Sequence, residues 1–139
     1  MNVCIVGYNE IALKGRNISN FENLLVNNIK KYLIKENIRF KQIKKSYKRI
    51  LIYTADSCSF LGCVFGVASY NQAVEVELNI NKIQESALDL VKNFKFETFR
   101  VSSRRANKRF ACDSLQLNIL IGGLIKNKLK IKQKLIKNE

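Results

Sequence analysis

The sequence predicts an α+β protein made of two small domains. Short apolar runs rich in β-branched residues alternate with segments whose apolar residues recur at helical spacing, so strands and helices follow one another along the chain. The chain has 139 residues, 47% of them hydrophobic, which is enough for one ordinary domain or two very small ones with packed cores. We expect the first domain to end near Glu77.

The chain opens with a strand and a long helix. Met1–Tyr8 is short, apolar and β-branched, which is typical of a buried strand, and Asn9–Asn17 connects it to the helix. The helix is expected over Ser19–Lys35, with Ser19 and Glu22 as a capping box. One face carries an apolar stripe that we assign to the core, formed by Phe21, Leu24, Leu25, Ile29, Tyr32 and Leu33.

Three further strands complete the first domain. Ile38–Ser46 and Arg49–Thr54 form strands joined by a turn at residues 46–48. Asp56–Val64 is a short helix or turn, and Val67–Glu77 is a strand with Val74 and Val76 pointing inward. This β-α-β-β-α-β order is the ferredoxin-like arrangement. The solvent side of the second strand is strongly basic, through Arg39, Lys41, Lys44 and Lys45.

The second half contains two helices and a short strand. Asn81–Phe94 is a helix with Asn81 as its cap, and its inward residues are Ile83, Ala87, Leu90, Val91 and Phe94. Phe99–Ser102 forms a strand, and a basic loop leads to a helix capped by Asp113 with Gln116 three residues later. The inward residues of that helix are Leu117, Leu120, Ile121, Leu124 and Ile125.

Two features of the C-terminal helix leave alternatives open. Gly122 and Gly123 each cost a helix about 1 kcal/mol relative to alanine, so we expect them to allow close approach, by a packed backbone in preference to RNA. The lysine-rich tail, Lys126–Glu139, fits an extension of the helix, a frayed end or a strand in which Leu129, Ile131 and Leu135 alternate.

The charge of the chain points to a polyanionic partner. The formal net charge is +14, from 25 Lys and Arg against 11 Asp and Glu, and the cations are spread along the whole chain. Such an excess favours a nucleic acid over an anionic membrane surface. The densest cluster precedes Asp113 without an intervening acid and contains Arg100, Arg104, Arg105, Lys108 and Arg109. Arginine forks and a helix start both suit phosphate, although a cluster of this kind also fits a merely solvated loop.

The composition argues against catalysis and metal binding. The chain has no histidine, its four cysteines form no C-x-x-C pair, and no nucleotide-binding glycine motif occurs. We therefore predict no cofactor, no metal and no catalytic residue. Cys4 lies in an apolar run and is assigned to the core. With no signal peptide and no long apolar span, we expect a cytoplasmic protein with reduced thiols.

Three separated motifs resemble the N-terminal region of tRNA 4-thiouridine synthetase (ThiI), in the order that this family has them. They are Y-N-E-I-A-L-K-G-R-N, V-F-G-V-A-S-Y-N-Q-A-V-E-V-E, and S-R-R-A-N-K-R-F followed by D-S-L-Q-L-N and I-G-G. Asn9, Ile18, Gln72 and Ala111 depart from the usual family residues, and the resemblance covers residues 1 to about 128. It implies a ferredoxin-like N-terminal domain over 1–77 and a truncated α/β THUMP domain over 78–139.

The resemblance also implies a function. In this family the two domains grip the acceptor stem and 3′ end of tRNA, so we expect a tRNA-binding module without membrane contact. Asn107 could hydrogen-bond a phosphate, a ribose or the loop backbone. The residues expected at the RNA are Lys14, Arg16, Arg104, Arg105, Asn107, Lys108 and Arg109.

Several alternatives accompany this interpretation. The pyrophosphatase-loop motif of a ThiI enzyme is missing from the sequence, so a separate catalytic subunit would carry that domain, or the chain is a remnant. The rival class is a sulfur-transfer or other tRNA-modifying enzyme that uses Cys63 or Cys112. An incomplete THUMP sheet also predicts association, as a homodimer or with a catalytic subunit. The opposing prediction is a monomer whose tail supplies a strand through Leu129 and Ile131.

Overall fold

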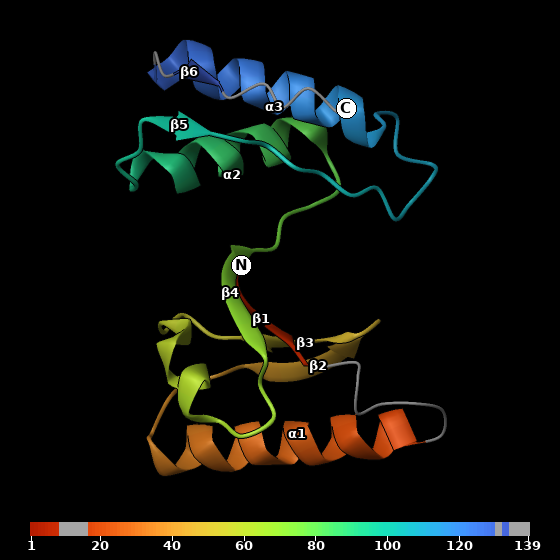
Figure 1. The fold of residues 1–139 in the computed structure, drawn as a ribbon, viewed down its shortest axis with the longest axis vertical. Coiled ribbons are helices and arrows are strands. Elements are labelled where there is room, and N and C mark those ends of the chain that lie inside the picture. Colours follow the sequence, from red (N-terminus) through yellow and green to blue (C-terminus); the bar gives the residue numbers. More distant parts are fainter. Residues whose placement is uncertain (9–16, 130–131, 134–139) are drawn as a thin grey trace. The chain divides into compact units, whose positions relative to one another are not determined.

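The computed structural model describes residues 1–8, 17–129 and 132–133 (Figure 1). The chain forms two compact units, Met1–Glu75 and Val76–Glu139, and each is described by itself.

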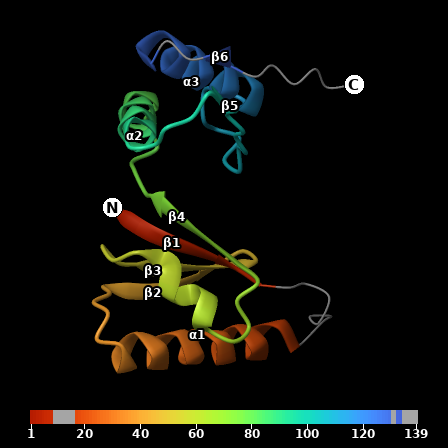
Figure 2. The ribbon, with the colours of Figure 1, turned by 60° about the vertical axis from the view of Figure 1, so that its left-hand side comes forward.

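The first unit is a four-stranded antiparallel sheet with one long helix on one face (Figures 1 and 2). Its elements are β1 (Asn2–Gly7), α1 (Asn17–Lys35), β2 (Gln42–Ser46), β3 (Arg49–Tyr53), the 3₁₀ helix η2 (Cys58–Cys63) and β4 (Ser69–Val74). The sheet order is β2-β3-β1-β4, so β1 lies between β3 and β4 and α1 connects it to the edge strand β2. The short helix or turn expected over Asp56–Val64 is the 3₁₀ helix η2.

The core of this unit lies between α1, η2 and the facing side of the sheet. Leu25, Ile29 and Leu33 of α1 are buried against Ile50 and Ile52 of β3. The spacing of the α1 residues is the i, i+4, i+8 stripe of an amphipathic helix, as predicted. Leu24 was predicted in the same stripe, but it is exposed, because it lies outside the i, i+4, i+8 row of α1 that faces the core.

The boundaries of α1 differ from the prediction. The helix begins at Asn17, two residues before Ser19, so Ser19 lies in the first turn and is not the cap. Glu22, expected to complete the capping box, accepts a hydrogen bond from the Tyr8 hydroxyl instead. This bond ties the helix to the residue that follows β1.

The cysteines correct another expectation. Cys4 is buried, as predicted, but it forms a disulfide with Cys58, so the prediction of four reduced thiols is wrong for this pair. The bond joins β1 to the start of η2, which lies against the same core. Cys63 and Cys112 are free thiols.

The second unit contains two helices that pack together and a two-stranded parallel sheet (Figures 1 and 2). The elements are α2 (Ile80–Lys92), β5 (Thr98–Phe99), α3 (Ser114–Leu129) and β6 (Lys132–Gln133). Thr98 pairs with Lys132 and Phe99 with Gln133. Among the residues of this unit that the structure describes, the buried ones all come from α3, and they are Leu117, Ile121, Gly122 and Ile125.

Four predictions for this unit need correction. The strand expected over Phe99–Ser102 is Thr98–Phe99. The cap of α2 is Asn79, whose side-chain oxygen accepts from the backbone N–H groups of Asn81 and Lys82. A Cβ added at Gly123 would meet no described protein atom within 4 Å, so a packed backbone does not explain that glycine, and close approach by RNA stays a prediction. Four residues expected to point inward are exposed, namely Val76, Leu90, Phe94 and Leu120.

The tail combines two of the three alternatives. The helix extends to Leu129, so this residue is helical and not part of a strand. A short strand then follows at Lys132–Gln133. Ile131 and Leu135 lie outside the described residues.

Candidate nucleic-acid interface

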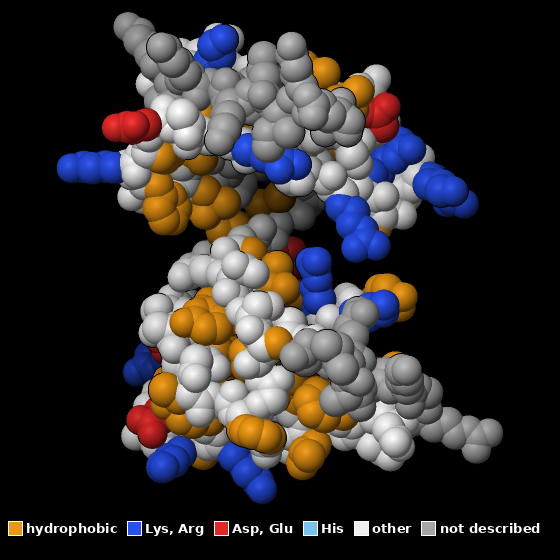
Figure 3. All heavy atoms as spheres, in the orientation of Figure 1, with side chains coloured by type: hydrophobic (Ala, Val, Ile, Leu, Met, Phe, Trp, Pro, Cys, Tyr) orange, Lys and Arg blue, Asp and Glu red, His pale blue; other side chains and the backbone are white. Residues whose placement is uncertain are grey.

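The arginine-rich loop between β5 and α3 is the candidate interface. The four cations predicted to contact RNA here are exposed, and they are Arg104, Arg105, Lys108 and Arg109. Figure 3 shows Lys and Arg side chains gathered over this part of the second unit. Arg100 is also exposed. The loop therefore presents several cations to solvent within one short segment.

The start of α3 fixes the end of this loop. Asp113 Oδ1 accepts from the Gln116 N–H at 2.8 Å, and Gln116 Oε1 accepts from the Asp113 N–H at 2.9 Å. This reciprocal pair is the capping box that the sequence predicted. The Leu117 N–H then donates to the Asp113 carbonyl at 3.0 Å, which closes the first helical turn. The last residue of the loop is thus locked to the helix.

Two further hydrogen bonds hold the loop in shape. The Arg105 N–H donates to the Ser114 hydroxyl at 3.1 Å, which anchors the middle of the loop to the first residue of α3. The Arg105 guanidinium donates to the Phe110 carbonyl at 3.3 Å. A guanidinium has five N–H donors, so one such bond leaves most of them for a phosphate.

Asn107 is placed by the loop backbone. Its side-chain oxygen accepts from the Arg109 N–H at 3.0 Å, and its carbonyl accepts from the Phe110 N–H at 3.2 Å. The loop backbone is therefore one partner of this side chain, and a contact with a phosphate or a ribose stays a prediction. The Asn107 turn therefore sets the direction of Lys108 and Arg109, the two cations inside it.

The remaining predicted site residues are in a different part of the chain. Lys14 and Arg16 lie outside the described residues. No group of three or more His, Cys, Asp or Glu that could hold a metal ion occurs in the described ranges. Within those same ranges, none of the helices has the length and apolar character needed to span a membrane.

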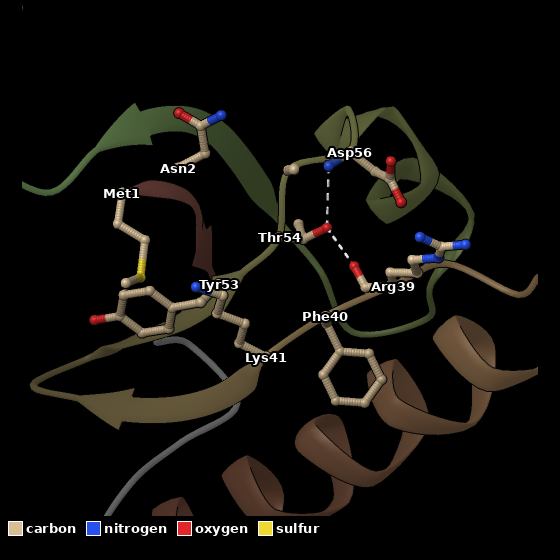
Figure 4. A pocket seen from close by; sticks show the side chains of 9 residues that line it. Met1, Asn2, Arg39, Phe40, Lys41, Tyr53, Thr54 and Asp56 are labelled. Atoms are coloured by element: carbon tan, nitrogen blue, oxygen red, sulfur yellow. Dashed lines mark hydrogen bonds between the residues drawn. The ribbon is translucent and has the colours of Figure 1, made fainter.

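A basic pocket of the first unit was not singled out from the sequence. It encloses about 440 Å³ and lies where the segment before β2 meets the end of β3 (Figure 4). The buried Thr54 lines this pocket. Its hydroxyl donates to the Arg39 carbonyl at 2.6 Å and accepts from the Asp56 N–H at 3.1 Å. The Glu75 carboxylate, which accepts from the Tyr53 hydroxyl, raises the pKa of this phenol. Arg39 and Lys41, both from the predicted basic strand, line the pocket together with Asp56.

Comparison with known families decides what kind of protein this is. Residues 3–71 match the ThiI ferredoxin-like domain, and residues 77–137 match the THUMP domain. The chain belongs to the ThiI family. The predicted α+β fold, with a ferredoxin-like domain followed by a THUMP domain, is confirmed, and so is the resemblance on which it rested.

Relatives in other organisms share this region. The chain is 37% identical over 134 residues to a probable tRNA sulfurtransferase of Thermococcus kodakarensis, a match that covers 89% of this chain and 35% of the relative. It is 34% identical over 130 residues to a probable tRNA sulfurtransferase of Metamycoplasma arthritidis, covering 92% of this chain and 33% of the relative. The chain thus spans about a third of the length of these curated relatives.

Two solved structures have the same fold. A crystal structure from Pyrococcus horikoshii Ot3 superposes with a TM-score of 0.82 at 35% identity, covering 99% of this chain and 48% of that one. The crystal structure of a 4-thiouridine synthetase–RNA complex with bound ATP superposes with a TM-score of 0.83. Its identity is 23% and it covers 99% of this chain and 36% of that one, so it supports the fold alone.

Proposed function

We propose that this ThiI-family chain is a tRNA-binding module that grips the acceptor stem and 3′ end of tRNA through its arginine-rich loop. The observation that carries the proposal is the loop itself, which exposes its cations and whose backbone is held by the Asp113–Gln116 capping box and the Asn107 turn. The proposal is also supported by the relatives that are named probable tRNA sulfurtransferases. Phosphate contacts would come from Arg104, Arg105, Lys108 and Arg109, with Lys14 and Arg16 from the first unit.

The chemistry of double-stranded RNA fits such a loop. An A-form helix is recognised mainly through its phosphates, its 2′-hydroxyls and its shape, because side chains cannot enter the narrow major groove. Recognition of this kind needs cations at fixed positions, and a preformed loop loses less conformational entropy on binding than a disordered one. The fixed loop therefore supports binding with little sequence preference.

Salt dependence of tRNA binding tests the proposal. The logarithm of the affinity should fall linearly with the logarithm of the salt concentration, with a slope of roughly 0.7 to 0.9 per phosphate contact. Arg104→Ala should lower that slope by roughly 0.7 to 0.9, the contribution of one phosphate contact. This variant is preferred to Arg105→Ala because the Arg105 side chain also bonds the loop. A charge-matched control is Lys30→Ala, since Lys30 is an exposed cation on α1.

Filter binding with labelled tRNA measures both variants and the wild type. The proposal predicts a weaker, shallower curve for Arg104→Ala and an unchanged one for Lys30→Ala. Wild-type protein that shows no salt slope or no tRNA binding would refute it. Equal binding by the two variants would reduce the loop to a solvated surface.

Catalysis would then belong to a pyrophosphatase-loop domain outside these two domains. The proposal includes a cytoplasmic location and association with a catalytic subunit that carries such a domain, or with a second copy of the chain. The isolated chain, given tRNA, ATP and a sulfur donor, should leave the uridines unmodified. Thiolated tRNA formed without added protein would contradict this and would favour the alternative chemistry at Cys63 or Cys112, the two free thiols.

A further inference from the structure

The β2–β3 hairpin of the first unit carries a second cationic segment. Residues 39–49 contain six cations and no acid, a density similar to that of the arginine-rich loop. β2 is the edge strand of the sheet, and its hairpin with β3 turns at Tyr47 and Lys48. Charged residues are common on edge strands because they prevent pairing with other chains, so charge alone does not make this a binding surface.

The register of the hairpin places two of these cations on one face. Ile50 and Ile52 of β3 are buried against α1, so their neighbours Arg49 and Leu51 lie on the opposite face of the sheet. Lys44 pairs with Leu51 and Ser46 with Arg49, which makes Lys44 and Arg49 diagonal neighbours on that face. Lys45 lies on the other face, where its ammonium donates to Asn23 Oδ1 at 2.6 Å.

The tip of the hairpin adds an exposed aromatic ring. Tyr47 is 79% exposed, and the Lys48 ammonium lies 5.4 Å from the centre of its ring. Lys48 has a φ of 56°, a left-handed conformation that is uncommon for a residue other than glycine. The ring is therefore open to solvent at the turn between the two strands that carry Lys44 and Arg49. In Figure 3, Lys and Arg side chains lie beside hydrophobic ones at the projecting end of the first unit.

We propose that this hairpin is a second RNA contact, in which the Tyr47 ring stacks on an unpaired base and Lys44 and Arg49 bind the adjoining phosphates. The inference deepens the proposed tRNA binding and rests on it. An exposed aromatic ring next to cations is the combination by which proteins bind unpaired nucleotides, since every base offers a π face. A membrane surface fits less well, because interfacial binding needs a broad apolar face and the tip has a single ring.

Replacement of the ring tests the stacking. Tyr47→Leu keeps the apolar bulk and removes the π face, so it should weaken tRNA binding by about five- to a hundredfold. The salt slope should not change because no charge is lost. Binding to a blunt RNA duplex, which has no unpaired base, should be the same for Tyr47→Leu and wild type. The matched control is Phe65→Leu, since Phe65 is an 89% exposed ring elsewhere in this unit.

Replacement of the cations tests the phosphate contacts separately. Lys44→Gln with Arg49→Gln should reduce the salt slope by about 1.4, or about 0.7 for each contact with a single strand. Lys30→Gln with Lys31→Gln removes the same charge from exposed positions on α1 and should leave the slope unchanged.

A fluorescent reporter makes the contact visible even where affinity changes little. The chain contains no tryptophan, so Tyr47→Trp introduces a single one at the tip. Its fluorescence should be quenched by tRNA and not by the blunt duplex, whereas Phe65→Trp should respond to neither. Quenching at residue 47 by tRNA supports stacking.

The outcomes separate this inference from the proposed function. If wild type binds tRNA with a salt slope, Arg104→Ala weakens it and Tyr47→Leu does not, then the hairpin contact is wrong and the proposed function stands. Equal losses for Tyr47→Leu and Phe65→Leu, or a loss on blunt duplex as well, would also overturn the stacking. Failure of the wild type to bind tRNA would overturn both proposals.

Discussion

Replacing Asp113 with alanine should destabilise the second unit by about 1 kcal/mol, because removal of an N-cap typically costs 0.5 to 2 kcal/mol. The Asp113 carboxylate accepts from the Gln116 N–H at 2.8 Å, and that bond is lost in Asp113→Ala. The reverse bond, from the Asp113 N–H to the Gln116 side chain, can persist. Asp113 caps α3, which contributes all the buried residues among those described in this unit. Fraying of the first turn of α3 therefore exposes Leu117 first.

Thermal unfolding followed by circular dichroism measures the effect. For a domain of 60 to 100 residues, 1 kcal/mol corresponds to a change in Tm of about 4 to 8 °C. Hydrogen exchange at the Leu117 amide, which bonds the Asp113 carbonyl, reports the same loss at the first turn. Asp113→Asn should retain the wild-type Tm, since asparagine caps as well as aspartate does.

A second control is Asp89→Ala on α2. Asp89 is an exposed acid whose ion pair with Lys92 spans 3.5 Å at the surface. Exposed pairs of this type contribute about 0.3 to 0.5 kcal/mol, so the Tm should change little. If Asp113→Ala melts like wild type, or Asp113→Asn falls as far as Asp113→Ala, the capping box does not hold this helix.

Two further predictions concern the first unit. Ile29→Ala, at a fully buried position, should lower the free energy of unfolding in urea by about 2 to 5 kcal/mol, whereas Ile34→Ala, at a residue 61% exposed on the same helix, should change it by less than about 0.5 kcal/mol. Similar losses for both would contradict the assigned core. The raised pKa of Tyr53, caused by its hydrogen bond to Glu75, means that the unfolded chain ionises this phenol at lower pH than the folded one. The stabilisation by this bond is therefore complete below pH 10 and is lost as the pH rises through the folded pKa. Tyr53→Phe should show a shallower alkaline decline of stability than wild type. Identical stability profiles for the two proteins would mean that the Tyr53–Glu75 bond does not contribute.

The order of the elements could be predicted because it follows from local periodicity. Alternation and β-branched runs locate the four strands of the first unit, and the apolar stripe of α1 locates Leu25, Ile29 and Leu33. The strand ends could not be located, because pairing partners determine where a ladder stops. β2 begins at Gln42, opposite Tyr53 at the end of β3, although the apolar pattern continues back to Ile38.

Helix caps and helix faces show the limits of periodicity more sharply. Asn79 and Asn81 are both good caps on residue type, and only the backbone conformation of Asn79, extended at φ −135°, distinguishes them. The helical stripe likewise identifies which face of α2 carries Leu90, but not whether another element covers it, and the helix ends at Lys92, before Phe94. A pattern fixes the direction of a side chain and leaves its burial to the tertiary fold.

The Cys4–Cys58 pair had no signal in the sequence. The two residues are 54 positions apart, and neither lies in a spacing motif, so only the packing of η2 against β1 brings them together. An expectation based on compartment alone could not anticipate that contact. Pairing of distant residues is a property of topology, which the composition of a chain does not encode.

The arginine-rich loop shows what a charge pattern can and cannot predict about a site. The cations and the capping box after them were evident from residue type, and the structure gives the capping box the predicted partners. The support inside the loop was not evident, because the same residue types suit phosphates and turns. The Asn107 side-chain oxygen accepts from the Arg109 N–H, and the Arg105 guanidinium donates to the Phe110 carbonyl. A substitution at Asn107 should therefore affect the site by changing the direction of Lys108 and Arg109. The loop needs both its cations and the residues that hold them in place.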